Sequence, residues 1–74
     1  MDYIDIHDPT GEYDFALDWS HLKSAYTPEV IQEMIEDRGV REMVRTVNEH
    51  CKLTYGWQAM SIAPVGGRLT VVPA

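Results

Sequence analysis

The sequence predicts a small α+β domain in which two β-hairpins form one antiparallel sheet packed against a helical segment. Three observations lead to this prediction. Apolar and polar residues alternate near the beginning of the chain and again near its end, which is typical of strands. Each alternating region contains a turn sequence at its middle. Between the two regions, apolar residues recur at helical spacing. The predicted order of elements is therefore β-β-α-β-β.

Size and composition favour one folded domain spanning residues 1–74. Hydrophobic residues make up 45% of the chain and charged residues 24%, which is ordinary for a globular protein. The single cysteine, Cys51, cannot form an intramolecular disulfide, whereas secreted domains of this size usually depend on several. Neither a signal-peptide pattern nor a membrane-spanning apolar run is found. These features predict a cytoplasmic protein.

Residues 3–7 and 12–18 are the two strands of the first predicted hairpin. Asp8-Pro9-Thr10-Gly11 between them suits a type I turn, with proline in the second place and glycine in the fourth. A four-residue loop pairs His7 with Glu12 and Asp5 with Asp14, and it sorts the apolar side chains onto one face. The expected inward face holds Ile4, Ile6, Tyr13, Phe15 and Leu17, and the outward face holds Asp5, His7, Glu12, Asp14 and Asp18.

The sequence from Thr27 to Lys52 predicts a helix that is kinked or broken near Gly39. Thr27 is a good N-cap, and Pro28 suits the first helical position. Two apolar stripes follow, one on each side of Gly39, and they are out of step by one or two residues. The first stripe consists of Val30, Ile31, Met34 and Ile35, and the second of Val40, Met43, Val44, Val47 and Cys51.

Residues 53–72 predict a second hairpin around Gly66-Gly67, which suits a two-residue turn with positive φ. This turn pairs Val65 with Arg68 and, further along the strands, Ile62 with Val71. Pro64 places its strand at a sheet edge, because proline donates no ladder hydrogen bond. Both faces of the hairpin are largely apolar. We therefore expect one face against the helix and the other against the first hairpin, a second copy of the chain or a partner.

The negative charge of the chain is concentrated at its beginning. Residues 1–22 contain six acidic residues and no Lys or Arg, whereas residues 23–74 contain six acids and six bases, so the net charge of −6 belongs to the opening segment. Such a segment repels a phosphate backbone, which disfavours direct binding to nucleic acid. Asp5 opposite Asp14 would destabilise the sheet, so the acidic face suits a role outside the fold. It is expected to contact a basic patch on another protein, the alternative being a solvated face that keeps the chain soluble.

Three arginines, Arg38, Arg41 and Arg45, recur at helical spacing, but each has an acidic residue four positions away. The predicted pairs are Asp37–Arg41, Arg38–Glu42 and Arg45–Glu49. This pattern indicates a solvated helix face that is neutralised internally, rather than a helix that reads DNA.

The predicted contact residues combine the outward face of the first hairpin with two aromatic residues near the sheet edge. Charge would set the association rate and the orientation, and the aromatic side chains would supply affinity. The expected partner is a larger protein with a basic patch, with proteins that handle nucleic acid as the favoured class, and inhibition would follow from occupancy. No cofactor or metal is expected, since the acidic spacing does not match an EF-hand. The contact residues are Asp5, His7, Glu12, Asp14, Asp18, Tyr3 and Trp57.

Two other functions are open. The first is a homo-oligomeric structural or assembly protein, in which the apolar second hairpin pairs with its copy, as in a homodimer. The second, an enzyme, is the least favoured, because no catalytic arrangement of side chains is visible. In general character, a short acidic α+β protein without a catalytic motif resembles the small accessory proteins that bacteriophages use to bind host machinery. This resemblance is one of type and assigns no site residue.

Overall fold

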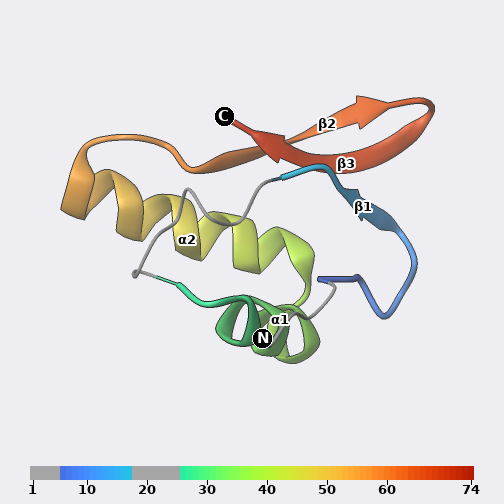
Figure 1. The fold of residues 1–74 in the computed structure, drawn as a ribbon, viewed down its shortest axis with the longest axis horizontal. Helices are drawn as coiled ribbons and strands as arrows, with labels where there is room; N and C mark the ends of the chain where they lie inside the picture. The colour runs from blue at the N-terminus through green and yellow to red at the C-terminus, as the bar shows by residue number, and fades with distance from the viewer. Residues whose placement is uncertain (1–5, 18–25) are drawn as a thin grey trace.

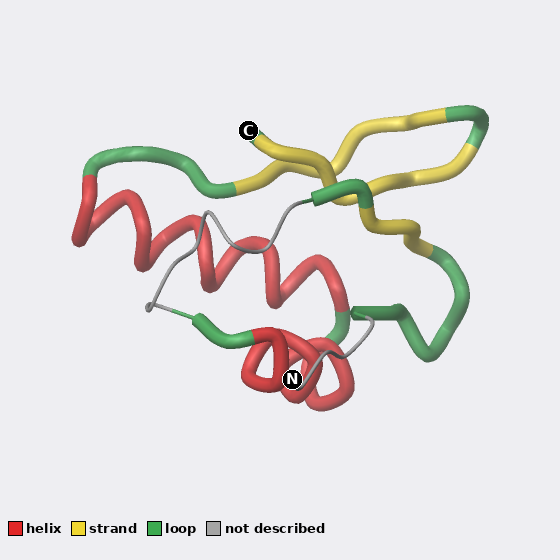
Figure 2. The backbone as a smooth tube through the Cα atoms, in the orientation of Figure 1, coloured by secondary structure: helices red, strands yellow, loops and turns green. Residues whose placement is uncertain are grey.

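A computed structural model describes residues 6–17 and 26–74 of the chain, which form two helices and a three-stranded mixed sheet (Figures 1 and 2). Strand β1 lies parallel to β3, and β2 lies antiparallel to β3 on its other side, so the strand order is β1-β3-β2. The predicted α+β class is confirmed, but the β-β-α-β-β order and the antiparallel sheet of two hairpins are wrong. The elements are β1 (Tyr13–Phe15), α1 (Pro28–Arg38), α2 (Val40–Tyr55), β2 (Met60–Val65) and β3 (Arg68–Pro73).

The predicted turn before β1 does form, but the hairpin around it does not. The Gly11 N–H donates to the Asp8 carbonyl at 2.9 Å, which closes the turn. The main chain of His7, which would have paired with Glu12, instead meets the side-chain amide of Gln32 on α1. The His7 N–H donates to Gln32 Oε1 at 2.9 Å, and Gln32 Nε2 donates to the His7 carbonyl at 3.1 Å. The side-chain amide therefore takes the place of a neighbouring strand.

Strand β1 finds its partner at the other end of the chain. Tyr13 lies opposite Leu69, Asp14 opposite Thr70 and Phe15 opposite Val71. The predicted pairing of Asp14 with Asp5 is thus replaced by pairing with β3, and Asp5 itself lies outside the described residues. The predicted inward face holds for its described members, since Leu17 is buried and Ile6, Tyr13 and Phe15 pack against the core. Ile4 lies outside the described residues.

The helical segment is broken at Gly39, as the sequence predicts. The Gly39 N–H donates to the Ile35 carbonyl and ends α1, while the Gly39 carbonyl accepts from the Met43 N–H and begins α2. Its φ of 90° suits glycine, because side chains with a Cβ rarely adopt that conformation. At the beginning of α1, Thr27 Oγ1 accepts from the Val30 N–H at 3.3 Å, which confirms the predicted N-cap.

The second hairpin forms in the predicted register. Val65 pairs with Arg68 and Ile62 with Val71, around a turn in which Gly66 and Gly67 both have positive φ. Strand β2 is an edge strand, as predicted from Pro64.

The core lies between the sheet and the helices, with α2 running beneath the sheet and α1 beside the beginning of α2 (Figure 1). Asn48 of α2 joins the two layers. Its Oδ1 accepts from the N–H groups of Ala59 and Met60, and its Nδ2 donates to the Met60 carbonyl at 2.8 Å. The fully buried side chains are Ile31, Met43, Val47, Cys51, Met60 and Val71.

Candidate functional site

The structure separates the residues that the sequence grouped as a contact surface. His7, Glu12 and Asp14 are exposed and lie around the turn that leads into β1. Trp57 belongs to the loop between α2 and β2, which lies at the opposite end of the molecule (Figure 1). Tyr3, Asp5 and Asp18 lie outside the described residues.

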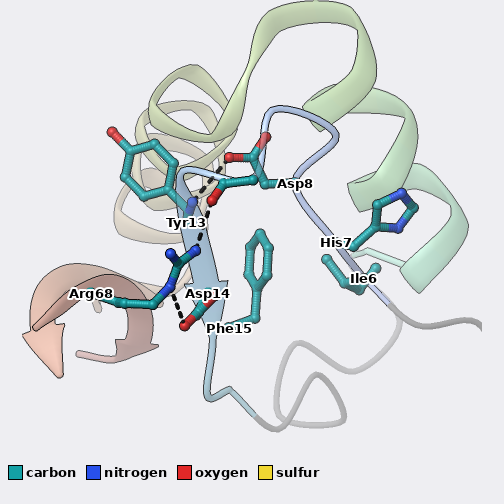
Figure 3. A pocket seen from close by; sticks show the side chains of 8 residues that line it. Ile6, His7, Asp8, Tyr13, Asp14, Phe15 and Arg68 are labelled. Atoms are coloured by element: carbon teal, nitrogen blue, oxygen red, sulfur yellow. Dashed lines mark hydrogen bonds and ion pairs between the residues drawn. The ribbon is translucent and has the colours of Figure 1, made fainter. Parts of the chain in front are cut away.

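Asp14 is partnered within the chain. Its carboxylate accepts from Arg68 Nε at 2.8 Å across the β1–β3 pair (Figure 3). The Arg68 guanidinium also donates to the Gly11 carbonyl at 2.7 Å. The hydrogen bond and the charge of Asp14 raise the pKa of Arg68. The arginine thus ties the turn and β1 to β3, and it neutralises one of the predicted contact carboxylates.

Asp8 is also used within the chain, as the organiser of the turn. Its carboxylate accepts from the Thr10 hydroxyl at 2.7 Å and from the backbone N–H groups of Thr10, Glu12 and Tyr13. Partial burial acts to raise the pKa of Asp8, but these hydrogen bonds together outweigh it and hold the pKa below its ordinary value.

An open depression of about 480 Å³ lies beside this turn (Figure 3). Asp8, Asp14 and Arg68 line it together with Ile6 and Phe15. Arg68 neutralises Asp14, and the Asp8 carboxylate is hydrogen-bonded to the turn, so these three side chains leave the depression a net charge of only −1. Glu12, an exposed acid that follows Gly11, lines a neighbouring depression together with Arg38 and Arg41.

A second acidic surface lies on α1. The sum of charges over residues 23–74 did not reveal it. Four acids against one base, Arg38, give α1 a net charge of −3. Residues 23–74 balance overall because the compensating bases lie on other elements, such as Arg45 on α2 and Arg68 on β3. The helical spacing of the acids was visible in the sequence, but summing the charge over 52 residues hid it. The exposed acids of α1 are Glu29, Glu33, Glu36 and Asp37.

A groove of about 390 Å³ runs beside these acids, between α1 and α2. Val30, which is 41% exposed, and the half-buried Met34 give it an apolar floor. Glu33 and Asp37 give it an acidic rim, where Asp37 also accepts from Arg38 Nε at 3.4 Å. We call this feature the helix groove; its lining is Tyr26, Val30, Glu33, Met34, Asp37, Arg38 and Thr46.

Four ring side chains, which we call the aromatic row, continue from the groove: Tyr26, His50, Tyr55 and Trp57. The Tyr26 hydroxyl lies 2.8 Å from His50 Nδ1, and the two rings meet edge to face with their centroids 5.4 Å apart. The centroids of His50 and Tyr55 are 6.4 Å apart, and Tyr55 stacks on Trp57 at 5.8 Å with an interplanar angle of 22°. Burial, with smaller contributions from Cys51 and Tyr55, raises the pKa of Tyr26. Because Tyr26 belongs to both features, the helix groove and the aromatic row form one continuous surface.

The arginines on the helices differ from the predicted arrangement. Arg45 bonds both Glu49, as predicted, and Glu42 at 2.8 Å. Asp37 and Arg41 do not share a helix, because the chain breaks at Gly39, and the Arg41 guanidinium lies 5.8 Å from the centroid of the Tyr13 ring.

Two other kinds of site can be addressed over residues 6–17 and 26–74. No group of three or more His, Cys, Asp or Glu side chains within these ranges could hold a metal ion. None of the helices in the same ranges is long and apolar enough to cross a membrane. Cys51 is buried, and burial raises the pKa of its thiol, as expected of a core residue.

Comparison with known proteins found no matching family model, no matching curated protein and no matching solved structure.

Proposed function

We propose that the protein is a non-enzymatic binding module whose acidic surface docks on a basic patch of a larger protein. The observation that carries the proposal is the exposed acidic side of α1 next to an apolar groove. A like-signed row of carboxylates costs the fold some stability, and it raises the association rate with a positively charged partner. The net charge of −6 acts in the same direction.

Proteins that handle nucleic acid are the favoured class of partner, because their phosphate-binding surfaces are rich in lysine and arginine. An acidic module that covers such a surface would compete with nucleic acid and inhibit by occupancy. The same charge disfavours direct binding of nucleic acid by this chain.

The test is affinity capture on the full chain, followed by titration of the purified partner at low and high salt. We expect the dissociation constant to rise by at least about tenfold at high salt, mainly through slower association. The proposal would be overturned by a partner whose dissociation constant is the same at low and high salt, or by a partner with an acidic contact surface.

A second function, self-assembly through the β2–β3 hairpin, is favoured by a separate observation. β2 is an edge strand, and two apolar side chains near the hairpin turn, Val65 and Leu69, are 52% and 41% exposed. Light scattering at micromolar concentration distinguishes the two functions. A dimer that persists in high salt supports self-assembly, and a monomer contradicts it.

A further inference from the structure

We infer that the helix groove and the aromatic row together bind a basic, amphipathic segment of the partner, in which lysine or arginine alternates with large apolar side chains. This inference rests on the proposed function and names the surface that performs it. It differs from the sequence-based expectation, which placed the contact on the outward face of the first predicted hairpin together with Tyr3 and Trp57, and it shares only Trp57 with it.

Charge complementarity selects a basic occupant. Glu33 and Asp37 line the groove, and Glu29 and Glu36 are exposed on the same helix. Arg38, the single base of α1, also lines the groove and pairs with Asp37, so the net charge of −3 on α1 comes from its other three acids. By contrast, the carboxylates of Asp8 and Asp14 beside β1 are already occupied by the turn and by Arg68.

The apolar part of the surface favours a segment with apolar side chains over one that carries positive charges alone. Val30, in the groove, is 41% exposed and Tyr55, in the aromatic row, 51%. Exposed apolar groups gathered beside a groove and bordered by charge are typical of a protein-binding surface. The occupant must therefore bring apolar side chains to Val30 and Met34, in addition to its positive charges.

The aromatic row can bind both the basic and the apolar side chains of such a segment. Stacked rings such as Tyr55 and Trp57 offer apolar area and a negative π face, on which a lysine or arginine side chain can lie. The hydrogen bond between Tyr26 and His50 holds the row against the groove, so that it costs little entropy to order on binding.

The experiment is an amide NMR titration of the full chain with two synthetic peptides of equal length and equal charge. One peptide carries lysine and leucine at helical spacing, and the other carries lysine and serine. We expect the lysine–leucine peptide to bind at least about tenfold more tightly. Its shifts should fall on Val30, Glu33, His50 and the Trp57 indole.

Two pairs of variants, each with a matched control, test the surface directly. Glu33→Gln should weaken the lysine–leucine peptide about threefold or more, whereas Glu12→Gln, an exposed acid beside β1, should not. Val30→Ser should weaken it, whereas Val65→Ser, at a valine of β2 that is 52% exposed, should not. All four side chains are exposed, so these substitutions should not unfold the chain. The peptide titration of the unmodified chain tests the inference without any substitution.

The outcomes separate this inference from the proposed function. Shifts confined to residues 6–14, or equal affinity for the two peptides, would overturn the inference and leave the acidic binding module standing. Absence of binding by both peptides at low salt would overturn both. Concentration-dependent shifts in the groove without peptide, abolished by Val30→Ser, would show that a second copy of the chain is the occupant and would also overturn the inference.

Discussion

The β2–β3 hairpin and the segment leading into β1 are both alternating stretches with a turn sequence, yet only the hairpin pairs as the sequence predicts. At Gly66-Gly67 the turn leaves the flanking backbone groups free to pair with each other, and the ladder follows from the turn. At Asp8 the carboxylate accepts from the N–H groups of Glu12 and Tyr13, and Gln32 binds the main chain of His7. A turn sequence thus predicts a hairpin only when no side chain competes for the ladder groups.

Both regions are held to a helix by a side-chain amide. Asn48 of α2 binds two N–H groups and one carbonyl at the beginning of β2, in a partly buried setting. Gln32 of α1 binds one N–H and one carbonyl of His7, in an exposed setting. When a hydrogen bond is lost, water can take the place of the missing partner at an exposed group but not at a buried one. The hydrogen bonds of Asn48 should therefore contribute more to stability than those of Gln32.

The largest effect is expected at Asn48. Asn48→Ala removes three partly buried hydrogen bonds, two from the N–H groups of Ala59 and Met60 and one to the Met60 carbonyl, which should cost about 2–4 kcal/mol. Urea denaturation measures the loss. A domain of this size has a stability of only about 3–5 kcal/mol, so the variant should be largely unfolded at room temperature.

Asn48→Asp sharpens this test. The aspartate keeps an acceptor for both N–H groups but loses the donor to the Met60 carbonyl, to which Gln58 Nε2 still donates. Its loss should therefore be smaller than that of Asn48→Ala. Thr54→Ala, at an exposed position of α2, is the control and should change stability by less than about 0.5 kcal/mol. Equal stability of Asn48→Ala and Thr54→Ala would contradict the role of Asn48.

Local features of this fold could be predicted from the sequence, and the distant ones could not. Caps and tight turns depend on a few neighbouring residues, which is why Thr27, Gly39 and the turn at Gly66-Gly67 were predictable. The parallel pairing of β1 with β3 joins residues more than fifty positions apart, and no periodicity specifies it.

In the candidate site too, some residues could be predicted from the sequence, and others depend on contacts between distant parts of the chain. Trp57 was predicted as a contact residue from its type and the apolar character around it, and it lies in the aromatic row. The acids at Glu33 and Asp37 were visible in the sequence, but their position beside an apolar groove follows from the packing of α1 on α2. The engagement of Asp14 by Arg68 follows from the same distant pairing that the sequence does not encode locally.

A smaller effect, with a characteristic pH dependence, is expected at Asp8. Asp8→Ala removes the acceptor for three backbone N–H groups of the turn and should cost about 1 kcal/mol at neutral pH. Because folding lowers the pKa of Asp8, its contribution is fully present above the unfolded value of about 3.9 and is lost as the pH falls through the folded value. Denaturation curves from neutral pH down to about pH 2 should therefore converge for the two proteins. A deficit that stays constant over this range would contradict the role of the charged form.

A local effect is expected at Gln32. Gln32→Ala should lower global stability by less than about 1 kcal/mol, since the three lost side-chain hydrogen bonds, two to His7 and one to Glu36, are exposed to water. Hydrogen exchange at the His7 amide should accelerate markedly, because its acceptor is gone. Gln58→Ala, which removes a side-chain amide near β2, is the control and should leave exchange at His7 unchanged. Unchanged protection at His7 in Gln32→Ala would show that other contacts hold this segment to α1.

The smallest effect is expected at the ion pair between Asp14 and Arg68, whose side chains are 50% and 51% exposed. Exposed pairs contribute little, and salt screens them, so the loss in Asp14→Asn should shrink in high salt. Arg68→Gln also removes the hydrogen bond to the Gly11 carbonyl, so part of its loss should persist in high salt. Thermal melts of the two single variants and the double variant, at low and high salt, measure both parts.

If β1 is held mainly by the packing of Tyr13 and Phe15, as their contact with the core indicates, none of the three variants should detach it. Loss of the β1–β3 cross-strand contacts in Asp14→Asn would instead show that the outward ion pair, and not the apolar face, determines this pairing.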